Sequence, residues 1–435
     1  MKNFIKIIFI ALSFIMGLFP QVYGKDNANK MDYSKFHIGA YYLKPYARTE
    51  SHIKDLADCG IDFIVNINYD KNTLDLLYKY HIGAIVTGAV PSWWGGDGKN
   101  AGKLNLSIPL DRYDKSAKSF MDHPAIWGLD IGDEPSALDF PYYNKIWNRV
   151  KKLFPNQFPY LNLYPNYASV SKNTAMQTVN QLGTTTYKEY IEQYCKNVTA
   201  SDYICYDFYL YSINVPRAYS NLITISDAAK KYNKSMWIVI QVNSNDKSKW
   251  ISENELRFQA YTAMAFGVQN IIWGCYTAGW WYNQVLDDKG NKTQQYDKLK
   301  TVNAEIHHLS IPYMKYKRVS TTFVDFKGTK WLNGVSTQSI GEYNDNIIYN
   351  LQSADNSPIL VEKLLSRKGK KREALFICTA DDPYDESPKM HTLCFKTNKR
   401  VVVTSVDKQY TLKKRKDKDY KVQMPSNRGM LIELL

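Results

Sequence analysis

Three carboxylic acids, Asp130, Asp133 and Glu134, lie within five positions where an apolar, strand-like run ends. Removing a carboxylate from water costs free energy unless a partner or a function compensates for it. Burial raises the pKa of a carboxyl group, so that it can deliver a proton near neutral pH. We therefore expect Glu134 to act as a catalytic acid, with Asp133 and Asp130 beside it. The structural alternative is an ion-paired cluster or a cap for the next helix.

A further acid, Asp207, ends another apolar run and is flanked by the aromatic residues Tyr206 and Phe208. Such surroundings favour a raised pKa, although backbone donors could equally satisfy a buried structural aspartate. Cleavage of a glycosidic bond normally needs two carboxyl groups, one to protonate the leaving oxygen and one to attack the sugar or activate water. Glu134 and Asp207 could fill these two roles.

Other polar and aromatic residues at the ends of apolar runs could bind a sugar. Gln241 cannot act as a base, but its amide can donate and accept hydrogen bonds with a hydroxyl. Aromatic rings stack on the flat faces of sugars, although core packing is the alternative for each of them. The aromatic candidates are Tyr41, Trp93, Trp94, Tyr209, Tyr276, Trp280 and Trp281. A Ser-His-Asp site is less supported, because G-x-S-x-G is absent.

The elements that carry these residues follow one repeated pattern. Eight short apolar runs alternate with stretches of helical period, at 37–43, 61–67, 81–88, 125–132, 159–165, 202–211, 236–242 and 270–277. This pattern predicts a parallel sheet covered by helices, and eight units fit a TIM (β/α)₈ barrel, whose working residues lie at the carboxyl ends of the strands. An open doubly wound sheet is the alternative, but Lys44-Pro45-Tyr46 is no glycine-rich phosphate turn.

Local signals refine this pattern. Thr49 is expected to open one helix that Gly60 ends, and Ser252 with Glu255 forms a capping box for another. Because side chains alternate along a strand, Glu134 should share the inward face with Gly128 and Gly132, whose small size leaves room there.

The pattern changes after residue 312. Short β-branched runs replace the alternation, at 346–352, 374–380, 391–397, 400–406 and 429–435. They predict a small antiparallel β-sandwich over 313–435, after a barrel over 25–312.

The N-terminus has the features of a signal peptide. Lys2 and Lys6 precede an apolar run, and a cleavage site is plausible after Gly24. We expect residues 1–24 to be removed and the protein to be exported, periplasmic or extracellular, with no membrane span left; an uncleaved anchor is the alternative. The six cysteines show no C-x-x-C spacing. We expect no metal and no nucleotide cofactor.

The formal charge is +14, which can favour acidic glycans, membrane surfaces or nucleic acid. Much of it lies in two basic runs, 367–372 and 413–418, between strand-like segments. Solvated hairpin tips are the simplest interpretation. We expect no nucleic-acid partner, because no binding motif accompanies the charge.

Several stretches of this sequence resemble a known group of enzymes. They are HPAIWGLDIGDEP (123–135), LNLYPNYAS (161–169), YICYDFYLY (203–211), WIVIQV (237–242) and ELRFQAYTAMAFGVQNIIWGCYT (255–277). Together they resemble the barrels of glycoside hydrolase clan A, and most closely proteins with the family 42 β-galactosidase-like N-terminal domain. The resemblance implies that Glu134 is the acid/base residue and that Asp133 replaces an asparagine that contacts a sugar hydroxyl.

The sequence departs from the clan at the seventh strand, where Gln241 stands near the position of the nucleophilic glutamate. Three alternatives follow. Asp207 could supply the nucleophile, or Asp207 or Asp130 could activate water in an inverting enzyme. The barrel could also bind a glycan without cleaving it. A weaker alternative is an adhesin for anionic polymers that uses the basic runs.

Overall fold

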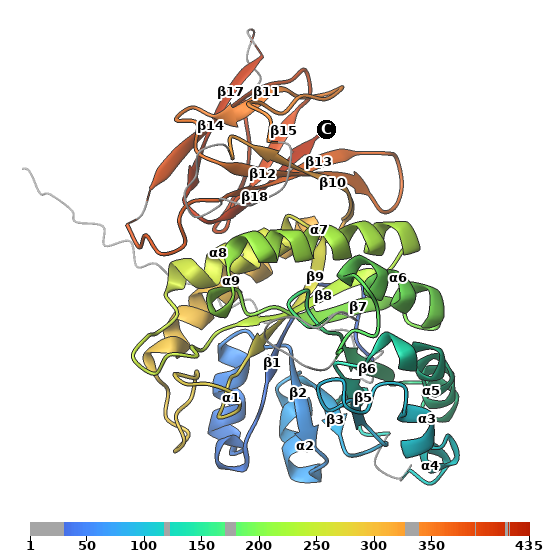
Figure 1. Cartoon of the computed structure of the whole chain (residues 1–435). Coiled ribbons are helices and arrows are strands. Elements are labelled where there is room, and N and C mark those ends of the chain that lie inside the picture. The colour runs from blue at the N-terminus through green and yellow to red at the C-terminus, as the bar shows by residue number, and fades with distance from the viewer. Residues whose placement is uncertain are drawn as a thin grey trace, which may run out of the picture.

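The computed structural model describes residues 30–116, 122–169, 180–326, 339–387, 389–413, 416 and 418–435. The expected signal peptide, residues 1–24, lies outside the described residues. Figure 1 shows a body of parallel strands and helices with antiparallel sheets above it. Within the described part of the chain, no helix is both long and apolar enough to cross a membrane.

A curled sheet of parallel strands forms the centre of the first part. Its strands are β1 (His37–Tyr41), β2 (Phe63–Asn68), β3 (Gly83–Thr87), β4 (Trp93–Trp94), β5 (Ile126–Asp133), β6 (Phe158–Asn162), β7 (Tyr203–Asp207), β8 (Ser235–Gln241) and β9 (Val268–Gly274). They pair in the order β4-β5-β3-β2-β1-β9-β8-β7, with β6 on β5. An isolated parallel bridge between Leu163 and Tyr206 joins the region after β6 to β7. The fold is therefore TIM-like α/β, and each of the eight predicted runs contains one strand.

Helices cover the outside of this sheet. They are α1 (Glu50–Asp58), α2 (Lys71–Lys79), α3 (Leu104–Ser107), α4 (Asp111–Asp114), α5 (Phe140–Leu153), α6 (Tyr187–Asn197), α7 (Val215–Tyr232), α8 (Glu253–Met264) and α9 (Gln294–Tyr313). The capping box of Ser252 and Glu255 is confirmed at the start of α8. Helix α1 follows Thr49, and Gly60 takes a positive φ of 76° just after the helix.

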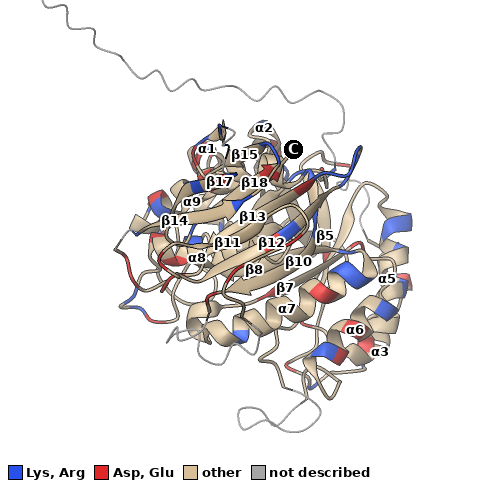
Figure 2. Ribbon diagram, turned by 90° about the horizontal axis from the view of Figure 1, so that it is seen from above, with Lys and Arg blue, Asp and Glu red and all other residues tan. Residues whose placement is uncertain are grey.

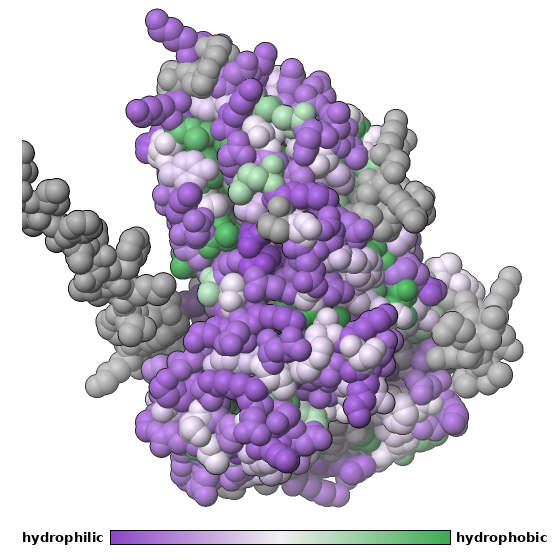
Figure 3. Space-filling model, turned by 90° about the vertical axis from the view of Figure 1, so that its left-hand side faces the viewer, coloured by the Kyte–Doolittle hydropathy of each residue, from purple (hydrophilic) through white to green (hydrophobic). Residues whose placement is uncertain are grey.

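Hydrophobic burial explains why the strands lie inside. Every residue of β1 and β7 is buried, as expected for parallel strands that are packed on both faces. Figure 2 shows the charged residues along the helices and loops, while the strands of the parallel sheet are mostly uncharged. The face in Figure 3 is mainly hydrophilic, with scattered hydrophobic residues. All six cysteines are free thiols, and five of them are buried.

The C-terminal part contains two antiparallel sheets. Its strands are β10 (Tyr316–Val324), β11 (Tyr349–Ser353), β12 (Ile359–Ser366), β13 (Glu373–Thr379), β14 (Met390–Lys396), β15 (Val401–Thr404), β16 (Gln409–Thr411), β17 (Asp419–Pro425) and β18 (Gly429–Leu434). One sheet has the order β10-β12-β13-β18-β15-β16 and the other β11-β14-β17. Buried side chains of both sheets, among them Val361 and Phe395, share one apolar cluster.

The two basic runs differ in their settings. Residues 367–372 connect the paired strands β12 and β13, so the expected hairpin tip is present there. Residues 413–418 lie between β16 and β17, which belong to different sheets. The strands that flank the second run are not paired with each other, and residues 414, 415 and 417 of the run lie outside the described residues.

The six-stranded sheet packs on the helices of the first part. Figure 1 places α7, α8 and α9 between the parallel strands and this sheet. The ring centroids of Tyr313 and Phe376 are 5.3 Å apart, and those of Tyr219 and Phe323 are 5.6 Å apart. One buried cluster continues from the parallel strands to the residues of this interface, which links the two parts through apolar contacts.

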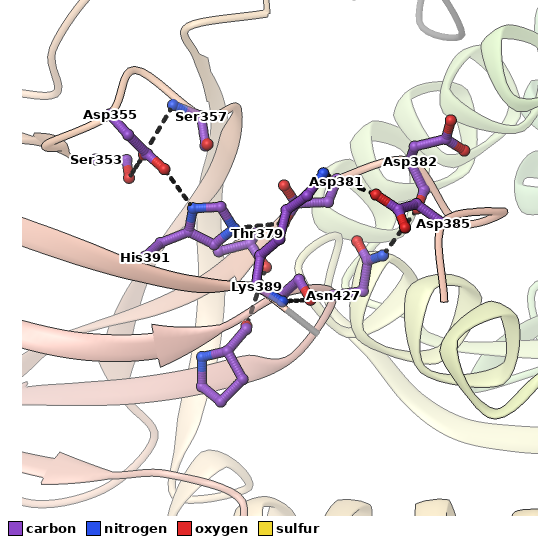
Figure 4. Close-up of polar contacts among 12 residues, drawn as sticks. Ser353, Asp355, Ser357, Thr379, Asp381, Asp382, Asp385, Lys389, His391 and Asn427 are labelled. Atoms are coloured by element: carbon purple, nitrogen blue, oxygen red, sulfur yellow. Dashed lines mark hydrogen bonds and ion pairs between the residues drawn. The ribbon is translucent and has the colours of Figure 1, made fainter. Parts of the chain in front are cut away.

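A polar network holds the loop after β13, and Figure 4 shows His391 between Asp355 and Asp381 at the start of this loop. His391 Nδ1 lies 2.9 Å from Asp355 Oδ2, and His391 Nε2 lies 2.9 Å from Asp381 Oδ2. Asn254, in the first turn of α8, donates to the carbonyl oxygens of Pro383 and Asp385 at 3.2 and 2.9 Å. His391 therefore holds the beginning of the loop, and Asn254 binds its centre.

Candidate active site

Strand β5 delivers the acids through a local irregularity. The pairing of β5 with β6 shifts register between Asp130 and Gly132. A Cβ atom on Gly132 would collide with the hydroxyl of Tyr143 in α5, so Gly132 faces the helices. The expectation that Gly132 leaves room on the inner face is therefore wrong. A bulge in β5 changes the alternation of side chains, and this brings Asp133 to the inner face.

Glu134 follows the last residue of β5 and takes a positive φ of 46°. Left-handed backbone is unfavourable for a residue other than glycine and often marks functional sites. The Glu134 N–H donates to the carbonyl of Asn162 at 2.9 Å, which ties this turn to β6. The side chain of Glu134 is partly buried.

Asn162, at the end of β6, joins two of the acids. Its Nδ2 donates to Asp133 Oδ1 at 3.2 Å and to Asp207 Oδ1 at 2.9 Å. These two oxygens are therefore no more than about 6 Å apart and share one hydrogen-bond donor. The Cys205 thiol donates to the side-chain Oδ1 of Asn162 at 3.6 Å, which keeps the side-chain Nδ2 turned toward the acids.

Asp207, at the end of β7, is the most buried of these acids, with 3% of its surface exposed. Burial, followed by the negative charge of Asp133, raises the pKa of Asp207 to about 7. Hydrogen bonds from Asn162 and from the Tyr167 hydroxyl, at 2.9 and 3.2 Å, oppose this rise by stabilising the charged form. Asp207 can therefore carry a negative charge near neutral pH.

Glu134 is held more strongly in its protonated form. Burial raises the pKa of Glu134 well above its usual value, and the charges of Asp207 and Asp133 raise it further. None of the hydrogen bonds between described residues is donated to its carboxylate. Asp133 is exposed toward solvent, yet the surrounding protein also raises its pKa, against the hydrogen bond from Asn162.

Asp130 lies on β5, three residues before Asp133, and contributes a further, partly buried carboxylate. Its carboxylate accepts from the Thr87 hydroxyl at 2.9 Å and from the Gly132 N–H at 3.1 Å. Burial raises the pKa of Asp130 to about 7, with a smaller rise from the charge of Asp133. We name Asp130, Asp133, Glu134 and Asp207 the acid cluster.

Aromatic rings surround the acid cluster, and several of them are expected site residues. The ring of Trp280 lies 5.5 Å from that of Tyr41, 5.7 Å from that of Tyr42 and 5.7 Å from that of Tyr209. Trp281 contacts Tyr209 at 4.8 Å. Burial is the main cause of the raised pKa of Tyr209 and of Tyr41, and the charges of Asp207 and Asp133, respectively, add most to it. We name these five residues the aromatic rim.

The tryptophans after β3 reach the same end of the sheet. Trp93 and Trp94 form the short strand β4, which pairs with Gly132 and Asp133 of β5. Trp94 has 56% of its surface exposed, so its ring is open to a ligand, whereas Trp93 is partly buried. The sequence pattern did not predict β4 as a strand.

Two expected site residues point elsewhere. Gln241 is fully buried, and its Oε1 accepts from the Tyr211 N–H at 3.1 Å while its Nε2 donates to the Ser212 hydroxyl at 3.4 Å. Tyr276 is also buried, and burial is the main cause of its raised pKa. The groups that add to this rise are Cys59, Asp55 and Tyr296, which belong to the end of α1, to α1 and to α9 rather than to the acid cluster. The structure does not bring either residue to the acid cluster.

Sequence reasoning missed Asn162 and Tyr167, the two donors to Asp207. Asn162 is a polar residue within the apolar run 159–165, which was the available signal. It also missed Asn243, a buried residue whose Nδ2 donates to the Trp280 carbonyl at 2.6 Å and holds the rim.

Comparisons with known proteins give only a likeness of fold. No family model and no curated protein sequence matches the chain. A putative α-L-fucosidase from Bacteroides thetaiotaomicron is similar in structure, with 13% identity and a TM-score of 0.47 over 62% of this chain and 97% of that chain. A family 5 mannosidase from Rhizomucor miehei has 13% identity and a TM-score of 0.43, over 64% of this chain and 96% of that chain. A family 128 endo-β-1,3-glucanase from Sorangium cellulosum has 15% identity and a TM-score of 0.40, over 61% and 98%. The reaction must therefore be argued from the site itself, and the resemblance to family 42 stays a prediction.

Proposed function

We propose that this protein is an exported glycoside hydrolase that cleaves a polysaccharide or oligosaccharide. The observation that carries the proposal is the bridge from Asn162 to Asp133 and Asp207, next to Glu134 and inside the aromatic rim. Glycoside hydrolysis needs one carboxyl group that is protonated and one that is ionised. Burial raises the pKa of both Glu134 and Asp207, but only Asp207 accepts hydrogen bonds that favour its ionised form, so the two groups supply such a pair.

Glu134 is the general acid in this proposal. Its strongly raised pKa keeps the proton that the leaving oxygen must receive. Asp207 is the nucleophile, because two hydrogen bonds favour its ionised form. Its oxygen attacks the anomeric carbon as the glycosidic bond breaks. In the second step Glu134 accepts a proton from a water molecule as the oxygen of that water attacks the anomeric carbon. The bond between the sugar and Asp207 breaks, and both carboxyl groups return to their starting forms.

The surrounding residues would place the sugar. Asp133 is exposed beside Asp207, so it can accept a hydrogen bond from a sugar hydroxyl. The rim rings and exposed Trp94 can stack against sugar faces. The two antiparallel sheets, which we interpret as a β-sandwich, would brace α7, α8 and α9 and so support the strands that carry the acids.

One observation favours a second function. Gln241 stands near the nucleophile position that the clan resemblance implies, and its amide is buried in hydrogen bonds to Tyr211 and Ser212. A barrel that lost its nucleophile could bind a glycan without cleaving it. This alternative predicts glycan affinity without turnover.

The test offers the protein a panel of neutral and acidic polysaccharides and measures hydrolysis by the release of reducing ends. Wild-type turnover that Glu134→Gln and Asp207→Asn each reduce at least about 10³-fold would support the proposal. Asp288→Asn, at an exposed acid, is the matched control and should keep full activity. Binding without turnover across the panel would instead establish the glycan-binding alternative.

The stereochemistry of the product tests the role of Asp207 separately. Attack by Asp207 followed by water retains the anomeric configuration, which proton NMR of the first product detects. With Asp207→Gly, added azide should restore cleavage and yield a glycosyl azide. An inverted product would refute Asp207 as the nucleophile while leaving Glu134 as the acid.

A further inference from the structure

A separate pocket opens beside the aromatic rim, where β1 and β2 end. Its volume is about 250 Å³, and its lining includes Tyr42, Lys44, Arg48, Asn66 and Asn68. We name it the cationic pocket. Two of these residues are positively charged, two carry amides, and the lining has no acidic residue.

The two cations face the pocket without a neutralising partner. Lys44 Nζ lies 4.8 Å from the centroid of the Tyr42 ring, which places the ammonium on the pocket wall. Arg48 donates from Nε to the Leu43 carbonyl at 2.9 Å, which fixes the guanidinium. Burial lowers the pKa of Arg48, and the charge of Asp70 opposes this effect, but no ion pair between described residues includes Lys44 or Arg48. Two partly buried positive charges in one pocket favour an anion there.

The backbone of β2 is shaped to present an amide to this pocket. The pairing of β2 with β3 shifts register between Val65 and Ile67, so Asn66 is an extra residue in the strand. Asn66 has a positive φ of 61°. Bulges of this kind redirect a side chain, and here the redirected side chain belongs to the pocket lining. The amides of Asn66 and Asn68 can bond to hydroxyl groups next to an anionic group.

The pocket lies beside the aromatic rim and shares one residue with it. Tyr42 lines the pocket, and its ring also contacts Trp280 and Tyr41 of the rim at 5.7 and 5.5 Å. The charge of Asp133 contributes to the raised pKa of Tyr42. One layer of aromatic side chains therefore separates the pocket from the acid cluster, so one saccharide chain could reach both.

We infer that the cationic pocket is a subsite for the anionic group of an acidic glycan, either a uronic acid carboxylate or a sulfate ester. Arg48 would form the directional contact, since a guanidinium matches the geometry of both groups, and Lys44 would add charge. The inference rests on the proposed function, because it names the class of glycan that the same site would hold. It differs from adhesion through the basic run 367–372, which lies on the β12–β13 hairpin.

The experiment measures affinity in the Glu134→Gln background, so that binding is separated from turnover. The probes are polygalacturonate and dextran sulfate, with methyl-esterified pectin and unmodified dextran as neutral counterparts, at one fixed ionic strength. The test variant is Lys44→Gln with Arg48→Gln, and the matched control removes two charges from the hairpin by Lys370→Gln with Lys371→Gln. Thermal melting of each variant verifies that it is folded.

We expect tighter binding of one anionic probe than of its neutral counterpart, and a loss of at least about tenfold in the test variant. The control variant should lose less than about twofold. Preference for polygalacturonate identifies a carboxylate ligand, and preference for dextran sulfate identifies a sulfate. The inference is overturned if neither anionic polymer is preferred, or if the control variant loses as much affinity as the test variant. Turnover of neutral glycans, with no preference for either anionic polymer, would overturn the inference but leave the proposed function intact.

Discussion

His391 makes a buried ionic contact that should stabilise the C-terminal part over a limited pH range. Only 2% of its side chain is exposed, and both ring nitrogens bond to carboxylates at 2.9 Å. The hydrogen bond to Asp381 is the main cause of a raised His391 pKa. We expect His391→Gln to weaken the attachment of the loop that Asn254 of α8 also binds.

The expected loss in the free energy of unfolding follows from the two contacts of His391. The Asp381 side chain is 9% exposed, so its charge-assisted hydrogen bond should contribute fully, about 1.5–3 kcal/mol. The Asp355 side chain is 53% exposed, so water screens that contact and we assign it little. Removing one partner also leaves Asp381 buried without its cation, and breaking buried pairs costs about 3–5 kcal/mol. We therefore expect His391→Gln to lower the free energy of unfolding by about 3 kcal/mol near pH 6.

The sign of the pH dependence follows from the raised pKa of His391. A histidine whose pKa is higher in the folded state stabilises that state fully below the unfolded value of about 6.5, and the contribution is lost as the pH rises through the folded value. Asp355 has a lowered pKa, with hydrogen bonds from Ser353 and His391 as the largest favourable causes, so its contribution is lost only in strong acid. The difference between wild type and His391→Gln should therefore be large near pH 6 and small well above the folded pKa of His391.

Urea unfolding followed by far-UV circular dichroism, at about pH 6 and about pH 9, measures this difference. Asp355→Asn is the control, and we expect it to lose less than about 1 kcal/mol at either pH. An equal loss for His391→Gln at both values would show that packing, not charge, accounts for the effect. A loss below about 1 kcal/mol near pH 6 would refute the ionic contact.

Two further predictions concern the acid cluster. Asn162→Ala removes a donor that lowers the Asp207 pKa, so the acidic limb of the pH profile of kcat/KM should move up by about 1–2 pH units. The control Asn148→Ala, on α5, should leave the profile unchanged. An acidic limb that does not move in Asn162→Ala would contradict the role of the bridge. Gly132→Ala should lower the free energy of unfolding by about 1–3 kcal/mol, because the added methyl group collides with the Tyr143 hydroxyl. Adding Tyr143→Phe to this variant should recover part of the loss. A urea midpoint that does not recover in the double variant would argue against the collision.

The sequence by itself determined the elements of this protein whose signals are local. Eight apolar runs were enough to predict eight parallel strands, because burial on both faces demands continuous apolar sequence. The capping box at Ser252 and the end of α1 at Gly60 were predictable because they depend on residues a few positions apart. The position of Asp130, Asp133 and Glu134 at a strand end likewise followed from the chain alone.

Only the tertiary structure decided which of these residues meet. The bulge in β5 depends on pairing with β6, and it changed the face that simple alternation assigned to Gly132. Asn162 became the centre of the site because parallel register places it beside Asp133 while its amide also reaches Asp207. Gln241, at a strand end like the acids, turned away to contacts with Tyr211 and Ser212. Contacts between distant strands determine these directions, because hydrogen-bond register and side-chain packing are properties of the assembled sheet rather than of any single segment.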